Sequence, residues 1–200
     1  MNWDLAYDAL LAEARASSES VTDWLRKELP HVFHDAYLRM SLRPANILEF
    51  THGTFDYIYD HFDGLPEAES NPSGAISESR LVAAYGVSRI NLAKRGHDDG
   101  RLRGWAGTPS TDFGPGWDKG HFIAHAIGGA VDGVEANVFL QRRSINRGGY
   151  RRMEQYCAEH AGVLCFSRPL YDDLTSRPAA VEFGVLKPDM IWWVQRFSNR

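Results

Sequence analysis

Four consecutive residues combine a carboxylate, a cation, a glycine and an imidazole: Asp118, Lys119, Gly120 and His121. A neutral imidazole accepts a proton near pH 7, so His121 is a candidate general base. Asp118 is close enough to orient the motif or the water shell of a metal ion, and Gly120 lets the backbone approach a substrate closely. So short a string recurs by chance, and a loop with a capped turn is the alternative interpretation.

A second group of polar residues begins at Asn146 and includes Glu154, eight residues later. The pattern predicts a helix over residues 146–160, with Glu154 within about a quarter turn of the face that carries Asn146. An amide oxygen and a carboxylate suit a hard cation such as Mg²⁺. The alternative is that Asn146 caps the helix while Arg151 and Glu154 form a surface ion pair.

The charge of the chain is unevenly distributed, although the net charge is only −4. Residues 1–78 carry 14 acids and 5 bases, whereas residues 79–200 carry 12 acids and 17 bases. Five arginines cluster around the second polar group, as a phosphate backbone would require. They are Arg142, Arg143, Arg147, Arg151 and Arg152. An arginine-rich, solvated helix face is the alternative.

Helical periodicity dominates the acidic first part of the chain. It predicts helical segments over residues 2–28, 31–43 and 55–62, with Pro30 ending the first. Ser17 and Ser18 could divide the first segment into two helices, and residues 47–52 fit either state. Residues 67–75 are rich in helix and strand breakers, and the charge balance changes sign just after them. We therefore expect residues 1–75 to form a helical, acidic N-terminal segment and residues 76–200 to form a separate domain.

Short apolar runs separated by turn residues dominate the second part and indicate a sheet. The strands are expected at residues 80–87, 135–141, 163–166, 180–186 and 190–197. Ile90 and Leu92 could continue the first of these as a hairpin, and Pro169 is expected in a turn. Together with the helix at residues 146–160, these strands predict an α+β fold.

Membrane spans and disulfide frameworks are not indicated. No apolar run approaches the roughly 18 residues that cross a membrane. Acids stand where a signal peptide would have its basic region, so we expect a cytoplasmic protein or one exported by a specialised route. Cys157 and Cys165 are the two cysteines, which is too few for a disulfide framework.

The motifs, taken together, resemble the DNA/RNA non-specific endonuclease family. The residues that carry the resemblance are Asp118 to His121, Asn137 within a predicted strand, and Asn146 followed by Glu154. The family signature is Asp-Arg-Gly-His, followed by a helix that opens with a metal-binding Asn and carries a Glu eight residues on. The resemblance implies a ββα-metal endonuclease domain with an antiparallel sheet. Lys119 departs from the usual Arg, which keeps the charge but loses the bidentate fork.

The resemblance implies a catalytic role for each matching residue. His121 would be the general base that activates water, and Asn146 the direct protein ligand of one Mg²⁺, with Mn²⁺ as an alternative. Asp118 and Glu154 would hold metal-bound waters or the geometry of the site. Arg103 would stabilise the charge of the transition state, and the products would carry a 5′-phosphate and a 3′-hydroxyl.

A second set of residues is implied in substrate binding. It comprises Lys119, Asn137, Arg147 and Arg151, and Asn137 would also fix the loop of the histidine or the strand beneath it. His125, a second histidine close to the motif, is expected to be structural. Ala158 occupies a position where the family often has an arginine.

The leading hypothesis is therefore a Mg²⁺-dependent endonuclease that cuts DNA, RNA or both with little sequence specificity. An antibacterial toxin or a defence effector are roles that fit such an enzyme, and residues 1–75 could dock an inhibitor, an immunity protein or a partner subunit. One alternative is a non-catalytic nucleic-acid-binding module on a decayed nuclease fold, against which the intact His121, Asn146 and Glu154 argue. A specific ribonuclease is the other alternative.

Overall fold

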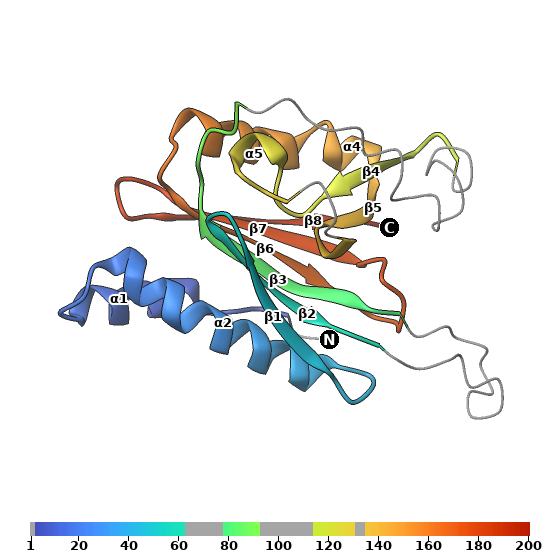
Figure 1. Cartoon of the computed structure of the whole chain (residues 1–200), viewed down its shortest axis with the longest axis horizontal. Helices are drawn as coiled ribbons and strands as arrows, with labels where there is room; N and C mark the ends of the chain where they lie inside the picture. Colours follow the sequence, from blue (N-terminus) through green and yellow to red (C-terminus); the bar gives the residue numbers. More distant parts are fainter. Residues whose placement is uncertain (1–2, 63–77, 93–113, 131–134) are drawn as a thin grey trace.

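The computed structural model describes residues 3–62, 78–92, 114–130 and 135–200. Its elements form three layers (Figure 1). Helices α1 (Tyr7–Ala16) and α2 (Val21–Met40) cover one face of a six-stranded sheet. A two-stranded hairpin and helices α4 (Arg143–Asn146) and α5 (Gly149–Glu159) cover the other face. These layers of helix and antiparallel sheet confirm the predicted α+β fold.

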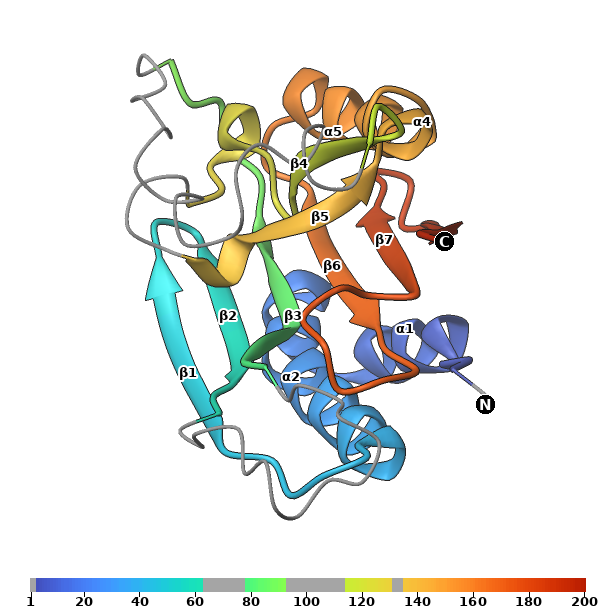
Figure 2. The same ribbon diagram turned by 90° about the vertical axis from the view of Figure 1, so that its right-hand side faces the viewer.

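The large sheet has the strand order β1-β2-β3-β6-β7-β8, and every neighbouring pair is antiparallel. Its strands are β1 (Ile47–His52), β2 (Phe55–Asp60), β3 (Arg80–Val87), β6 (Leu164–Leu170), β7 (Ala180–Leu186) and β8 (Trp192–Ser198). The separate hairpin pairs β4 (Trp117–His121) with β5 (Val138–Arg142). Short 3₁₀ turns, η2 (His125–Ile127) and η3 (Glu135–Asn137), lie between its strands. Figure 2 shows the hairpin lying across the sheet.

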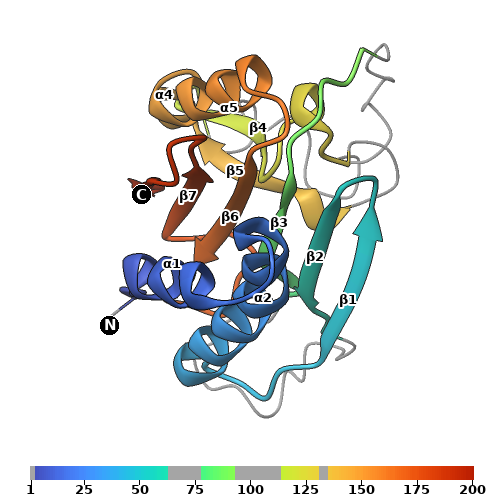
Figure 3. The same ribbon diagram turned by 90° about the vertical axis from the view of Figure 1, so that its left-hand side faces the viewer.

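Both faces of the sheet are buried, because each is covered by another layer. On the hairpin side, Phe55, Tyr57 and Phe183 pack with Phe139 of the hairpin and Tyr150 of α5. Figure 3 shows α1 and α2 on the other side of the sheet. Buried side chains there form a second cluster that includes Leu25, Leu29, Phe33, Ile58 and Phe166. Burying one such side chain contributes roughly 1.5–3 kcal/mol. The chain therefore positions its hairpin layer on a sheet that is anchored from both sides.

Helix α2 continues through Pro30, which corrects the prediction that this proline ends the first helix. Ser20 caps the helix, since its side chain accepts a hydrogen bond from the Asp23 backbone N–H at 3.2 Å. Proline within a helix removes one backbone hydrogen bond. Burial of Leu29 and Phe33 on either side of it in sequence offsets that loss.

Residues 55–60 form the strand β2, so the helix predicted over residues 55–62 is wrong. The strand contributes Tyr57 to one core cluster and Ile58 to the other, so its apolar residues show no simple alternation. Because β2 pairs with β3, the sheet continues across the boundary expected after residue 75. The division into residues 1–75 and 76–200 stays a prediction about independent folding.

The second part of the chain confirms most of the predicted strands and corrects several details. β3, β5, β6, β7 and β8 lie at or near the predicted positions. Pro169 pairs with Val181 inside β6 instead of forming a turn. Residues 88–92 form no strand, and Leu92 is 91% exposed. Among the described residues, no helix is both long and apolar enough to cross a membrane.

Candidate active site

A cleft of about 640 Å³ opens in the hairpin layer, on the side of the sheet that α1 and α2 do not cover. Its walls come from β4, from the η2 turn, and from α4 and α5. The lining residues with functional side chains are Asp118, Lys119, His121, His125, Asn146, Arg147, Arg151 and Glu154. The structure thus gathers seven of the nine predicted site residues, together with His125, in one place.

Asp118 organises one wall of this cleft. Its carboxylate accepts hydrogen bonds from Arg143 Nε at 3.0 Å, from Asn146 Nδ2 at 3.2 Å, and from both Nε and Nη2 of Arg147 at 2.9 and 3.2 Å. Burial of the Asp118 carboxyl opposes its ionisation, but these donors, with Arg147 foremost, outweigh burial and lower its pKa. Asp118 is therefore an anionic clamp that ties β4 to α4.

Asn146 is the last residue of α4, which corrects the prediction that it opens a helix over residues 146–160. The helix is interrupted at Gly148, where an added Cβ would lie 2.3 Å from the Ser144 carbonyl oxygen, and α5 begins at Gly149. Because Asn146 Nδ2 donates to Asp118, its Oδ1 is the atom that remains for a ligand. Among the described residues, nothing donates a hydrogen bond to that oxygen.

Glu154 lines the same cleft from α5. Its side chain is only partly exposed, and its carboxylate accepts no hydrogen bond from a described residue. Burial raises the pKa of Glu154 to about 8, against the opposing effect of the nearby Arg151 guanidinium. A carboxyl group with so few partners favours the arrival of a cation, which would stabilise its charged form.

His121 and Lys119 lie on one face of β4, since alternate residues of a strand point the same way. Both line the cleft. His125 lines it as well, from the start of the η2 turn, although it was expected to be structural. Nothing in the sequence beyond the closeness of His125 to the motif indicated that this partly exposed imidazole would line the cleft.

Asn137 does not reach the cleft, which corrects its predicted role in substrate binding. It is fully buried, and its side chain is used in three hydrogen bonds to the backbone. Oδ1 accepts from the Ile123 N–H at 2.9 Å, while Nδ2 donates to the carbonyls of Ile123 at 2.8 Å and Ala130 at 2.6 Å. This geometry agrees with the other expectation, that Asn137 fixes the segment after the histidine.

Tyr150 holds the same segment from the other side. Its hydroxyl donates to the Phe122 carbonyl at 2.6 Å and lies 2.8 Å from Ser167 Oγ. The tyrosine is fully buried on α5, four residues before Glu154. It therefore links the backbone next to His121 with the helix that carries Glu154. No motif in the sequence pointed to Tyr150 as a residue of the site, and Arg143 was identified only as one arginine of a cluster.

Arg103 lies outside the described residues, so its predicted role is neither supported nor opposed by the structure. Arg147 and Arg151 are exposed and line the cleft, as binding of a phosphate requires. Together with Lys119, they give the cleft more cationic than anionic side chains.

The donor set of the cleft fits a hard cation that keeps most of its water. Asn146 offers an amide oxygen and Glu154 a carboxylate with no hydrogen-bond donor among the described residues. No group of three or more His, Cys, Asp or Glu side chains in the described part of the chain comes together to hold a metal. Such a group would characterise a zinc or calcium centre rather than one of this kind.

Comparison with known proteins bears on this site. Residues 76–164 match the family model described as DNA/RNA non-specific endonuclease. No curated protein matches the chain. Among solved structures, the chain is similar to one described as the Sda1 nuclease with bound zinc ion, at 18% identity and a TM-score of 0.40, over 78% of this chain and 75% of that one. The family match confirms the resemblance indicated by the motifs and supports nuclease activity for this chain.

Proposed function

We propose that this chain is a metal-dependent endonuclease that hydrolyses phosphodiester bonds of DNA and RNA with little sequence specificity. The observation that carries the proposal is that His121, Asn146 and Glu154 line one cleft although they come from three different elements. The match of residues 76–164 to the endonuclease family supports the same reaction. A phosphodiester carries one negative charge per linkage, which suits the cationic side chains around the cleft.

His121 acts as the general base in this proposal, because an imidazole that is neutral near pH 7 can take a proton from the attacking water. Lys119, Arg147 and Arg151 bind the phosphates on either side of the scissile bond. Asp118 positions the site, since its carboxylate orients the amide of Asn146 and neutralises part of the charge of Arg147.

Asn146 would hold a Mg²⁺ ion through its side-chain oxygen, with Glu154 on the same cleft wall binding the water around the ion. Mn²⁺ is the alternative ion. When bound, the ion supplies positive charge that neutralises the phosphate and assists the leaving oxygen. Glu154 would bind these waters in its ionised form. The positive charge of the bound ion favours that form.

The biological role in this proposal is that of a toxin or defence effector with a macromolecular partner. The acids of α1 and α2 lie on the face of the sheet opposite the cleft (Figure 1). A protein bound only to that face would leave the cleft open, so it would act as a partner subunit. An inhibitor or immunity protein would need to reach the hairpin layer.

Incubation of the purified protein with supercoiled plasmid and with RNA tests the proposal. With Mg²⁺, both substrates should be degraded, and the products should carry 5′-phosphates, as the family resemblance implies. An excess of EDTA should abolish the cleavage. Degradation that persists in EDTA would overturn the metal requirement, and intact substrates under every condition would overturn the nuclease assignment. Cleavage of RNA alone would identify a specific ribonuclease.

A further inference from the structure

Two arginines gather around a single tryptophan at the open end of the β4–β5 hairpin. The guanidinium carbon of Arg142 lies 4.3 Å from the centre of the Trp117 ring, and that of Arg177 lies 5.7 Å from it. Arg142 is opposite Trp117 in the register of β4 and β5, whereas Arg177 comes from the connection between β6 and β7. The tryptophan ring attracts both cations through its electron-rich face.

Neither arginine forms an ion pair with a carboxylate in the described part of the chain. Arg142 Nε is also buried and has no hydrogen-bond partner there. Two guanidinium groups at one ring repel each other, and an anion between or beside them would relieve this repulsion. By contrast, Arg143 and Arg147 share the carboxylate of Asp118. Arg142 and Arg177 thus keep their full charge for a ligand.

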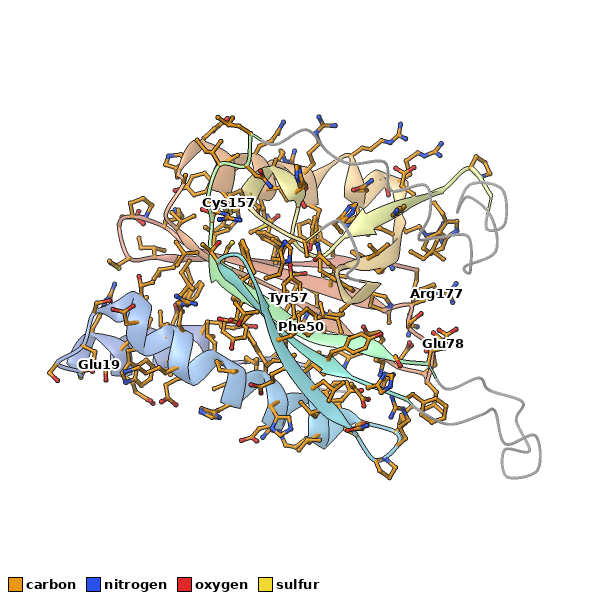
Figure 4. All side chains as sticks on the ribbon, viewed as in Figure 1. Glu19, Phe50, Tyr57, Glu78, Cys157 and Arg177 are labelled. Atoms are coloured by element: carbon orange, nitrogen blue, oxygen red, sulfur yellow. The ribbon has the colours of Figure 1, made fainter. Side chains whose placement is uncertain are left out.

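The backbone that carries these two arginines is fixed by one buried side chain, that of Asn199. Its Oδ1 accepts a hydrogen bond from the Arg142 N–H at 2.8 Å, and its Nδ2 donates to the Pro178 carbonyl at 3.0 Å and to the Leu140 carbonyl at 2.9 Å. Asn199 therefore ties the end of β5 to the residue after Arg177. Figure 4 shows Arg177 beyond the ends of the strands, near Glu78. The carboxylate of Glu78 accepts a hydrogen bond from the Ser176 N–H at 2.6 Å. The pair of arginines is preorganised rather than free on a mobile loop.

The pair lies in line with the cleft. Trp117, Lys119 and His121 share one face of β4, and Arg142 is on the same face of β5. The five residues of β4 from Trp117 to His121 are separated by four steps, which span about 13 Å at roughly 3.3 Å per residue. Phosphates along one DNA strand are about 3.4 Å apart along the helix axis, so this distance corresponds to about four nucleotides.

We propose that Trp117, Arg142 and Arg177 form an ancillary subsite that binds backbone phosphates of a nucleic-acid strand running from the catalytic cleft. The proposal rests on the proposed nuclease function and extends it, because it makes substrate length a determinant of affinity. A strand of a few nucleotides held at His121 does not reach the subsite. A longer strand contacts both places and gains affinity from the second one without any change in the chemical step.

The test compares two double variants that remove the same charge. Arg142→Gln/Arg177→Gln removes the subsite, and Arg15→Gln/Arg39→Gln removes two exposed arginines from the helical layer as the control. Fluorescence anisotropy in EDTA measures binding of labelled oligonucleotides of 3 and 20 nucleotides, chosen as about below and well above the reach of the subsite. Thermal unfolding verifies that each variant is folded.

The subsite variant should bind the 20-nucleotide strand about tenfold more weakly than wild type, with unchanged binding of the trinucleotide. The dependence of its affinity on salt should also fall, by about 1.4 in the log–log slope for two lost contacts to a single strand. The control variant should match wild type in both respects. Equal weakening for both lengths, or equal behaviour of the two double variants, would overturn the subsite.

Cleavage separates this outcome from failure of the proposed function. If wild type cuts the 20-nucleotide strand with Mg²⁺, the subsite variant should show a higher KM at an unchanged kcat. If wild type cuts nothing, the nuclease assignment fails, whereas the binding comparison in EDTA still decides the subsite. Arg177→Gln alone, at an exposed position, should show a smaller loss of the same kind.

Discussion

Two glutamates on opposite faces of the sheet show how differently the two outer layers are built. Glu182, on the helical side, is 3% exposed and accepts hydrogen bonds from Tyr7 Oη, Arg168 and Arg196 at 2.6–3.1 Å. Glu154, on the hairpin side, accepts none from any described residue, and burial raises its pKa to about 8. The carboxylate of Glu182 is thus fully hydrogen-bonded by protein donors, whereas that of Glu154 can still accept hydrogen bonds from a ligand or bind a cation.

The comparison indicates a division of labour between the layers. The network around Glu182 joins α1 to β6, β7 and β8, and the apolar cluster around Phe33 fills the space beneath them. The hairpin layer also packs on the sheet, through Tyr57, Phe139 and Tyr150, but its outer side keeps polar groups in an open cleft. Figure 4 shows Cys157 in the hairpin layer and Glu19 in the helical layer. An unsatisfied polar group on a rigid support is a feature of functional sites.

Removal of residues 1–78 is the most severe test of the different roles of the helical and hairpin layers. It should have the largest effect on folding of all the changes considered. The truncation deletes α1, α2, β1 and β2, so β3 loses a partner strand and both core clusters lose large side chains. We expect an unfolded or insoluble product, measured by circular dichroism and size-exclusion chromatography. A soluble, cooperatively folding fragment that cuts nucleic acid would show instead that residues 79–200 are an independent domain, as the charge boundary favoured.

Glu182→Gln should destabilise the protein strongly, because it leaves the buried guanidinium of Arg168 without its ion-pair partner. Loss of one partner from a buried pair costs about 3–5 kcal/mol. Urea unfolding followed by tryptophan fluorescence measures the difference. The protein that still folds should retain its cleavage rate, since Glu182 is remote from the cleft. A large loss of kcat in folded protein would contradict the separation of the two layers.

Asp118→Asn should lower the cleavage rate by about tenfold at saturating substrate, because Asn146 and Arg147 lose their anionic anchor. The pKa of Asp118 is lowered in the folded state, so its contribution to stability is present above the unfolded pKa and is lost as the pH falls through the folded pKa. Wild type should therefore lose stability below about pH 4 by a larger amount than Asp118→Asn. Identical acid unfolding of the two proteins would contradict the clamp.

Glu154→Gln should have the smallest effect on stability. Whether it stabilises or destabilises the protein depends on pH. The pKa of Glu154 is raised to about 8 in the fold, so the metal-free protein loses stability as the pH rises from the unfolded pKa towards 8. The variant lacks this loss and should be the more stable protein above pH 8 in EDTA. Thermal unfolding from pH 5 to 9 measures it, and parallel curves for the two proteins would rule out the raised pKa.

The sequence predicted which residues come together in the cleft better than it predicted their local geometry. Asn146 and Glu154 were identified from their spacing on one continuous helix, yet they belong to two helices separated by Gly148. They still line one cleft, because the break changes the direction of the chain without moving either residue away from β4. The order of the motifs along the chain therefore predicted the shared cleft correctly, whereas the expectation of one continuous helix was wrong.

Other features depended on contacts that a sequence does not display. The residues of β2 at positions 55, 58 and 59 fit a helical period, because a strand buried on both faces loses its alternation. Asn137, expected in the substrate site, is buried, whereas His125, expected to be structural, lines the cleft. Both differences arise because burial depends on the layers that pack around a residue. The clamp of Asp118 on Arg143 joins residues 25 positions apart and became visible only in the fold.

Cleavage of supercoiled plasmid by His121→Ala and by His125→Ala tests the central claim most directly. Both histidines line the cleft, so the pair controls for loss of an imidazole and for changes in binding. Loss of the general base should lower the single-turnover rate by about 10²–10⁴-fold in His121→Ala, whereas His125→Ala should stay within about tenfold of wild type. Equal rates for His121→Ala and wild type would contradict the assignment of His121 as the base.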